Sequence, residues 1–239
     1  MYPSNPKATL WLFAYNGLTA ETHMCILREL QGWPTLTHRV KGGDANIDRA
    51  RSKVASWYLA EPQEEAGDVL LMVDHDSVWE KGDLGKIAKR ALEHKAVVGG
   101  MYPKRAFGQG GAFRVTDGAD GAYKIGEDKL IPAEFVGTGF IAIPREILWV
   151  IAEDLPTVKG DFKPFFMPYV LYDNDNEYPT DDQAFCARVR EAGFPVYLST
   201  WPRLKHTGDY TYRMLDAYGT PPPDRDIELT YADPRKVAA

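Results

Sequence analysis

The sequence has few cysteines and no long apolar run. Only two of its 239 residues are cysteine, Cys25 and Cys186, and they lie far apart without the spacing of metal ligands. We therefore expect two reduced, buried thiols of a cytoplasmic protein. The longest apolar runs are much shorter than a membrane span, and the first residues do not form a signal-peptide pattern. The sequence thus predicts a protein without membrane association.

Acidic residues outnumber basic ones. The chain has 28 lysine and arginine residues against 34 aspartate and glutamate residues, which gives a formal net charge of −6. This balance argues against a protein that holds nucleic acid through bulk electrostatics, although a local basic surface stays open. The apolar fraction of 44% is sufficient for a hydrophobic core.

Apolar runs alternate with helical periodicities along the chain, which predicts an α/β layer architecture. Strands are expected over residues 8–14, 35–40, 69–73, 96–101, 140–143 and 195–199. Helices are expected over residues 20–30, 44–60, 83–94 and 181–192, and after Pro144. We predict one domain over residues 1–212, with a mostly parallel central sheet flanked by helices and a small antiparallel hairpin within 108–126. Residues 156–179 read as a long loop of the kind that binds ligands, and residues 213–239 as a tail or strap.

Two carboxylates follow the most apolar strand directly. Asp74 and Asp76 come after Val69–Val73, at the edge of an open sheet where ligand crevices form. Oxygen ligands of this kind suit Mg²⁺ or Mn²⁺ bound together with substrate phosphates. Two other Asp-x-Asp pairs occur, at 173/175 and 224/226, but neither follows an apolar strand. His75, between the two aspartates, is expected to point the opposite way along an extended segment and to be structural.

Arg51 lies four residues after Ile47, beside the apolar stripe of its predicted helix. A buried arginine is costly unless an anion meets it. The anion is either an internal carboxylate, Asp48 or Asp74, or the diphosphate of a bound substrate, with Asp48 then accepting from a base or ribose. The two interpretations are compatible.

Three further positions fall where strands end or helices begin. His206 follows the last predicted strand, and a metal shared with Asp74 and Asp76 is geometrically plausible. Asp181 and Asp182 stand in the first turn of a helix, where they either complement the helix dipole or supply a general base. Gly137-Thr138-Gly139 precedes a strand, and its glycines allow either a ligand to approach the backbone or a simple turn.

Taken in order, these pieces resemble GT-A glycosyltransferases, close to the family 2-like enzymes and especially their small phage-borne members. The resemblance covers about residues 8–212. It rests on Ile47-Asp48-Arg49-Ala50-Arg51, the Val69–Asp76 segment, Val98-Gly99-Gly100-Met101-Tyr102, Gly137-Thr138-Gly139-Phe140, Asp181-Asp182 before Phe185-Cys186, and His206-Thr207-Gly208. The sequence departs from the family pattern in two places, with Asp181 where glutamate is commoner and Ser52 where asparagine is.

The resemblance implies a Rossmann-like GT-A fold and a transfer of sugar from a nucleotide-diphosphate sugar to an acceptor hydroxyl. It implies that Asp74, Asp76 and His206 hold Mn²⁺ or Mg²⁺, and that Asp182, beside Asp181, is the base of an inverting enzyme. It places the donor against Tyr15, Asp48, Arg51, Asp74, Gly137, Thr138 and Gly139. A phage-encoded enzyme would act in the host cytoplasm.

Two other functions and several acceptors stay open. A nucleotidyltransferase would also hold a nucleotide phosphate at carboxylates, but it normally has a Gly-rich basic loop near the N-terminus, which residues 15–19 are not. A non-catalytic carbohydrate-binding module would need no buried Arg51 and no metal–diphosphate pocket. The residues do not identify the acceptor, and the resemblance to phage-borne members suggests a hydroxylated base in DNA, a surface glycan or another small hydroxyl compound. Residues that can face a DNA backbone are Arg39, Lys41, Lys104, Arg105 and Arg114.

Overall fold

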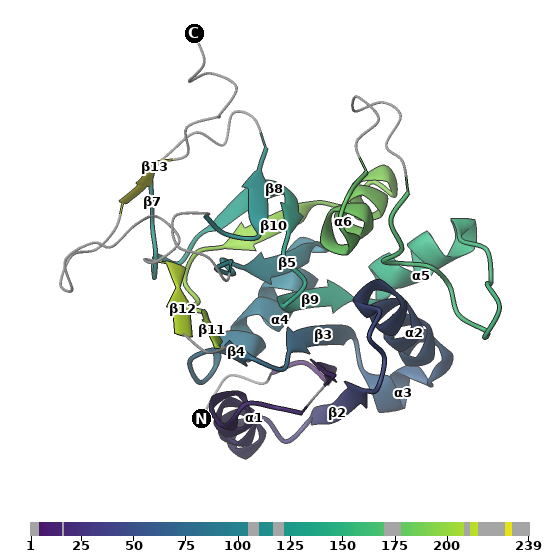
Figure 1. Cartoon of the computed structure of the whole chain (residues 1–239), viewed down its shortest axis with the longest axis horizontal. Coiled ribbons are helices and arrows are strands. Elements are labelled where there is room, and N and C mark those ends of the chain that lie inside the picture. The colour runs from purple at the N-terminus through teal and green to yellow at the C-terminus, as the bar shows by residue number, and fades with distance from the viewer. Residues whose placement is uncertain are drawn as a thin grey trace, which may run out of the picture.

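The computed structural model describes residues 5–15, 17–104, 110–116, 122–169, 178–207, 211–214 and 228–230. These residues form a central eight-stranded sheet with helices on both faces (Figure 1). The order of its strands is β2 (Leu36–Gly42), β1 (Ala8–Ala14), β3 (Val69–Asp74), β9 (Phe140–Pro144), β5 (Val97–Gly100), β10 (Val196–Ser199), β8 (Leu130–Val136) and β6 (Phe113–Val115). The predicted α/β class is confirmed.

Most strands of the sheet run in one direction. β1 pairs in parallel with both β2 and β3, and β10 pairs in parallel with β5. Only β9 and β8, among the strands described in this sheet, run against the others, because each pairs antiparallel with both of its neighbours. The parallel strands therefore end at one common edge, as the sequence predicts.

The helices divide between the two faces of the sheet. α1 (Ala20–Gly32) and α4 (Asp83–His94) pack on one face. α2 (Ile47–Ala60), α5 (Arg145–Asp154) and α6 (Asp181–Glu191) pack on the other, and the short α3 (Gln63–Ala66) follows α2. The fully buried strand β1 serves both cores, since Leu10 and Leu12 face the α1–α4 layer while Trp11 and Phe13 face the α2 layer. Unbroken apolar runs are needed for this double burial.

Two small antiparallel sheets accompany the main one. β4 (Ser77–Val78), β11 (Lys205–Thr207) and β12 (Thr211–Arg213) form a three-stranded sheet. β7 (Ala122–Lys124) pairs with β13 (Glu228–Thr230), so the small antiparallel element expected near residues 108–126 takes its second strand from the far end of the chain. β6, which the sequence also placed in a hairpin, pairs with β8 instead. β13 lies within the predicted tail or strap, while the domain boundary near residue 212 stays a prediction.

Polar caps fix the starts of the helices. The Asn46 side chain accepts from the Arg49 N–H at 2.9 Å, so α2 begins at Ile47 rather than at residue 44. Gln183 Oε1 accepts from the Thr180 N–H at 2.8 Å in a capping box that starts α6 at Asp181. The predicted starts of these two helices are therefore close to those observed, and the remaining difference at α2 is set by its cap.

Part of the expected long loop is firmly attached to α2. Ser52 Oγ accepts from the Phe166 N–H at 3.0 Å, and Ser56 Oγ accepts from the Lys163 N–H at 2.8 Å. The Arg188 guanidinium of α6 donates to the Phe165 carbonyl at 3.0 Å. Residues 155–169 are thus a packed connection, while residues 170–177, with the second Asp-x-Asp pair, lie outside the described residues.

Both cysteines are buried free thiols, as the sequence predicts. Within the described ranges, every helix lacks the combination of length and apolar character that crossing a membrane requires.

The stability of the fold is expected to depend on pH through Asp83, in the first turn of α4. Burial raises the pKa of its carboxyl group to about 7, with the charges of Glu80 and Glu29 acting in the same direction. Because this value lies above the ordinary value of 3.8, the free energy of unfolding falls as pH rises from about 4 to 7. Asp83→Asn should therefore raise the melting temperature at pH 8 relative to the parent, and much less at pH 4. An equal change at both values, or the same change in the exposed control Glu93→Gln, would contradict this assignment.

Candidate active site

A pocket opens at the carboxyl edge of the parallel strands. Register pairs Phe13 of β1 with Asp74 of β3, and Ala14 with Gly42 of β2, so these three strands end side by side. The pocket there has a volume of about 210 Å³. Its walls come from the ends of β1, β2 and β3 and from the start of α2. The lining residues are Phe13, Ala14, Tyr15, Lys41, Asp44, Ala45, Ile47, Ala50, Asp74, His75 and Asp76.

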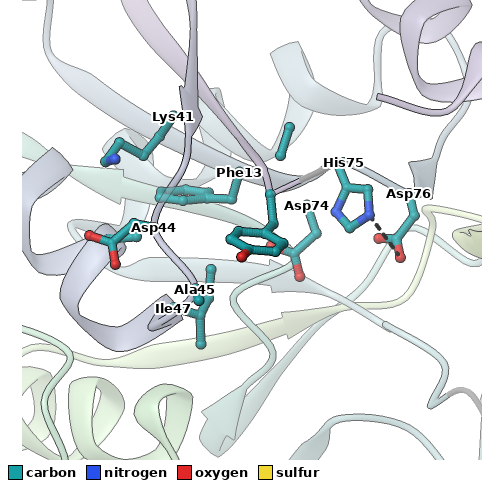
Figure 2. Close-up of a pocket in the computed structure, with 11 residues that line it drawn as sticks. Phe13, Lys41, Asp44, Ala45, Ile47, Asp74, His75 and Asp76 are labelled. Atoms are coloured by element: carbon teal, nitrogen blue, oxygen red, sulfur yellow. Dashed lines mark ion pairs between the residues drawn. The ribbon is translucent and has the colours of Figure 1, made fainter. Parts of the chain in front are cut away.

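Figure 2 shows Lys41 and Asp44 on one side of this pocket and Asp76 on the other, with Asp74 and His75 between them. The side chains of Asp74 and Asp76 therefore face one cavity, as the sequence predicts for carboxylates at a strand end. Tyr15, 60% exposed, also lines the pocket. This arrangement offers a bound ligand three carboxylates, one ammonium group, one imidazole and several apolar contacts.

Asp76 is buried and lies against His206. The His206 Nε2 atom is 3.2 Å from Asp76 Oδ2. The pairing of β4 with β11 brings the two side chains together. His206 is the register partner of Ser77, and the Thr207 N–H donates to the Asp76 carbonyl at 2.8 Å. The sequence pattern predicts that Asp76 and His206 lie at the same edge of the sheet. It does not predict the short strands β4 and β11 that bring them into contact.

The His206 ring is held from two sides. Its Nδ1 atom lies 3.1 Å from the Pro103 carbonyl, which can only accept, so Nδ1 carries the proton of this contact. The ring also packs on Tyr102, with 4.7 Å between centroids. A histidine that binds a metal usually donates its other ring N–H to a carbonyl or a carboxylate, and the contact of Nδ1 with the Pro103 carbonyl has this form.

The structure corrects the expectation for His75. Residues 75 and 76 form a turn between β3 and β4, so the alternation of an extended strand does not apply to them. His75 lines the pocket beside the two aspartates, and its Nε2 atom lies 4.0 Å from Asp76 Oδ2. Its backbone is fixed as well, since its N–H donates to the Phe13 carbonyl and its carbonyl accepts from Thr19. His75 is thus part of the pocket.

Arg51 is buried and joins two carboxylates. One terminal nitrogen, Nη2, donates to Asp74 Oδ1 at 2.7 Å, and Nη1 donates to Asp181 Oδ2. Although burial opposes the charged form, these two carboxylates hold the pKa of Arg51 above its ordinary value. The predicted internal ion pair with Asp74 is present, whereas the pair with Asp181 was not anticipated. Contact of Arg51 with a diphosphate stays a prediction.

The carboxylate that faces the pocket from the start of α2 is Asp44 rather than Asp48. Asp44 accepts from Arg49 Nη2 at 2.6 Å, and this arginine lowers the pKa of Asp44 to about 2. Asp48 accepts from the N–H of Arg49 at 2.9 Å and is absent from the pocket lining. No sequence periodicity distinguishes the two, because Asp44 precedes the helix in an irregular turn.

Gly137, Thr138 and Gly139 lie at the same edge as the pocket. The Asp74 N–H donates to the Gly139 carbonyl at 3.0 Å, and Ser77 Oγ donates to the same carbonyl at 3.0 Å. A Cβ atom on Gly139 would lie 2.6 Å from the Tyr102 ring and 2.9 Å from Asp74 Oδ2. The absence of a side chain at Gly139 therefore lets the Tyr102 ring and the Asp74 carboxylate pack against its backbone. The contact of residues 137–139 with a donor stays a prediction.

Asp181 and Asp182 begin α6 next to Arg51. Asp182 Oδ1 accepts from the Gln183 N–H at 2.9 Å and from the Thr180 hydroxyl. Burial raises the pKa of Asp182, the Thr180 hydrogen bond lowers it, and the charge of Asp181 raises it again. The net direction is upward, which suits a carboxylate that has to accept a proton near neutral pH.

Two of the three predicted metal ligands lie together. Among the residues that the structure describes, no group of three or more histidine, cysteine, aspartate or glutamate side chains is arranged to hold an ion. Of the predicted ligands, Asp76 and His206 are together, while Asp74 is engaged by Arg51. The predicted set of three therefore stays a prediction, and two of its members are adjacent.

No protein-family model matches this chain, and no curated protein does. Among solved structures, the chain is similar to A197 from STIV, with a TM-score of 0.56 and 19% sequence identity. The similarity covers 84% of this chain and 86% of A197. At this level of identity it shows that the two share a fold, and the function has to be argued from the site.

Proposed function

We propose that the chain is a GT-A-type, metal-dependent glycosyltransferase, which moves a sugar from a nucleotide-diphosphate sugar to an acceptor hydroxyl. The observation that carries this proposal is the pocket at the end of β3, where Asp74, His75 and Asp76 face one cavity and His206 meets Asp76. The order of motifs that resembles GT-A enzymes supports it. The fold shared with A197 from STIV supports the fold on which the proposal rests, and no more.

The charges of the pocket favour a ligand that arrives with a cation. Three aspartates and one lysine line the pocket, so a diphosphate alone would meet carboxylates of its own sign. The Asp76–His206 separation of 3.2 Å brings together a carboxylate oxygen and an imidazole nitrogen, two atom types that bind divalent ions. Mn²⁺ or Mg²⁺ held by Asp76 and His206, with Asp74 close by, would neutralise the leaving diphosphate.

The remaining chemistry is assigned to the chain's own residues. In the transfer, the bond from the anomeric carbon to the leaving phosphate oxygen breaks, and its electron pair goes to the diphosphate. The acceptor oxygen forms the new bond to that carbon, and its proton passes to the Asp182 carboxylate. Displacement from the opposite face inverts the anomeric configuration. Asp44, Tyr15 and Asp74 line the pocket, and we assign the first two to the nucleoside and Asp74 to its ribose.

For the acceptor, we favour a glycan or a small hydroxyl compound over DNA. Arg39 is ion-paired with Glu61, and Arg114 with Glu134 at 3.3 Å, so neither presents uncompensated charge to a phosphate backbone. Lys41 Nζ donates to the Gly42 carbonyl at 2.8 Å. Lys104 is exposed, and Arg105 lies outside the described residues.

The proposal is tested by donor hydrolysis and transfer. UDP-glucose, GDP-mannose and dTDP-glucose are incubated with the chain and Mn²⁺, and the released nucleoside diphosphate is measured with and without candidate glycan acceptors. We expect slow hydrolysis of at least one donor, faster release with the correct acceptor, and a product of inverted configuration. Release of pyrophosphate from a nucleoside triphosphate and a sugar phosphate would instead identify a nucleotidyltransferase.

A further inference from the structure

The Arg51 guanidinium connects two regions that are distant in sequence. It donates to Asp74 at the end of β3 and to Asp181 at the start of α6, and its side chain is 5% exposed. It also lies over the Phe13 ring, 5.5 Å from the centroid. Because charge-assisted hydrogen bonds are directional, this arrangement fixes both carboxylates relative to one planar group.

Each partner of Arg51 belongs to a different part of the proposed site. Asp74 lines the pocket assigned to the donor. Asp181 directly precedes Asp182, the carboxylate assigned as the base, in the first turn of α6. Arg51 therefore stands between the group that meets the donor and the turn that carries the base.

Stability alone is a weak reason for such a buried arrangement. The cost of desolvating charged groups can exceed their mutual attraction, and apolar replacements of buried ion pairs are often no less stable. A clamp on the diphosphate is an alternative role for Arg51, but both of its terminal nitrogens already donate to carboxylates.

We propose that Asp181 is a positioning residue that, through Arg51, holds the Asp182 carboxylate in a fixed relation to the donor at Asp74. This inference rests on the proposed function. It adds that the contacts of Arg51 with Asp181 and Asp74 align the base with the donor. Misplacing a catalytic group by about 1 Å can cost roughly 100-fold in rate, so a rigid link of this kind has a measurable role.

The surroundings of Asp182 agree with this role. Its Oδ1 atom is held by Thr180 and by the Gln183 N–H, so its orientation follows the first turn of α6. Burial raises the pKa of Asp182, while the charges of Asp181 and Arg51 act in opposite directions. Asp181 and Arg51 thus act on the base in opposite electrostatic directions, with the effect of Asp181 the larger.

A double-mutant cycle tests the link. Asp181→Asn, Arg51→Met and the double variant are compared for the kcat of donor hydrolysis and for the Kd of the same donor with Mn²⁺, using the nucleotide sugar that the unaltered chain hydrolyses best. We expect Asp181→Asn to lower kcat by about 10–100-fold with a Kd within about twofold. The double variant should have a kcat no lower than that of Arg51→Met, because each substitution breaks the same Arg51–Asp181 ion pair. Glu93→Gln, in an exposed ion pair of α4, is the matched control and should keep the parent kcat.

Several results would overturn the link. These are a parent-like kcat for Asp181→Asn, multiplicative losses in the double variant, or a Kd that rises as much as kcat falls. Arg51→Lys replaces Arg51→Met if the latter does not fold, with the same expected pattern. If the unaltered chain neither binds nor hydrolyses any donor of the panel, the proposed function is wrong, and so is the positioning role of Asp181. If the unaltered chain is active but the double-mutant cycle does not give the expected pattern, only the positioning role is wrong.

Discussion

Asp182→Asn is expected to lower turnover by roughly 10²–10⁴-fold, the usual size of general-base catalysis, while donor affinity stays within about twofold. The amide keeps the shape of the side chain and its capping contacts to the Gln183 N–H and Thr180. It cannot take the proton of the acceptor hydroxyl. Because burial raises the pKa of Asp182, the rate of the parent should rise with pH as this group ionises. That rise should disappear in the variant.

The competing role of Asp182 is a capping carboxylate near the helix dipole. Its loss would then cost about 0.3–1 kcal/mol of stability and no chemistry. Melting temperature and turnover measured on the same variant separate the two roles. A parent-like turnover with a lowered melting temperature would contradict the assignment, and so would a product of retained anomeric configuration.

Asp76→Asn is expected to abolish metal-dependent donor binding and leave the fold intact. Asp76 is 1% exposed and lies against His206 Nε2, and a carboxylate beside an imidazole offers two ligand types suited to a divalent ion. Outer-shell partners of a metal typically contribute 10–100-fold in affinity, so loss of a direct ligand should weaken Mn²⁺-dependent donor binding by at least about 100-fold. His206→Ala should act in the same direction.

His23→Asn, on the exposed face of α1, is the control for the histidine change and should bind donor like the parent. Calorimetry of donor binding at several Mn²⁺ concentrations gives both affinities. Donor binding by Asp76→Asn that still depends on Mn²⁺ with parent affinity would exclude Asp76 as a ligand.

The inner strands β1, β3 and β9 were predictable, because burial on both faces demands unbroken apolar runs. β8 of the same sheet was not predicted, because partly buried and exposed residues interrupt its buried ones. β1 coincides with the predicted range 8–14, and β3 extends the predicted 69–73 by Asp74 alone. The helix 83–94 is also observed as predicted, since its apolar positions repeat at helical spacing. β4, β11 and β13 were not predictable. Each has two or three residues, which is too short for a period to appear, and each pairs with a segment distant in sequence.

The sequence predicted several residues of the site, but it did not predict which of them contact one another. A strand end places Asp74 and Asp76 at the ligand edge, and Arg51 beside an apolar stripe requires an anion. The turn after Asp74 directs His75 into the pocket, and an irregular segment brings Asp44 there instead of Asp48. Such turns are decided by local backbone hydrogen bonds and by tertiary packing, which no periodicity in the sequence records.

The central claim is that the pocket at the end of β3 binds a nucleotide-diphosphate sugar together with a divalent ion. Calorimetry of the unaltered chain with UDP-glucose, GDP-mannose and dTDP-glucose, in Mn²⁺ and then in excess EDTA, tests it most directly. The account predicts saturable binding of at least one donor in Mn²⁺ and its loss in EDTA. Binding of equal affinity in EDTA, or no binding of any donor in Mn²⁺, would contradict it.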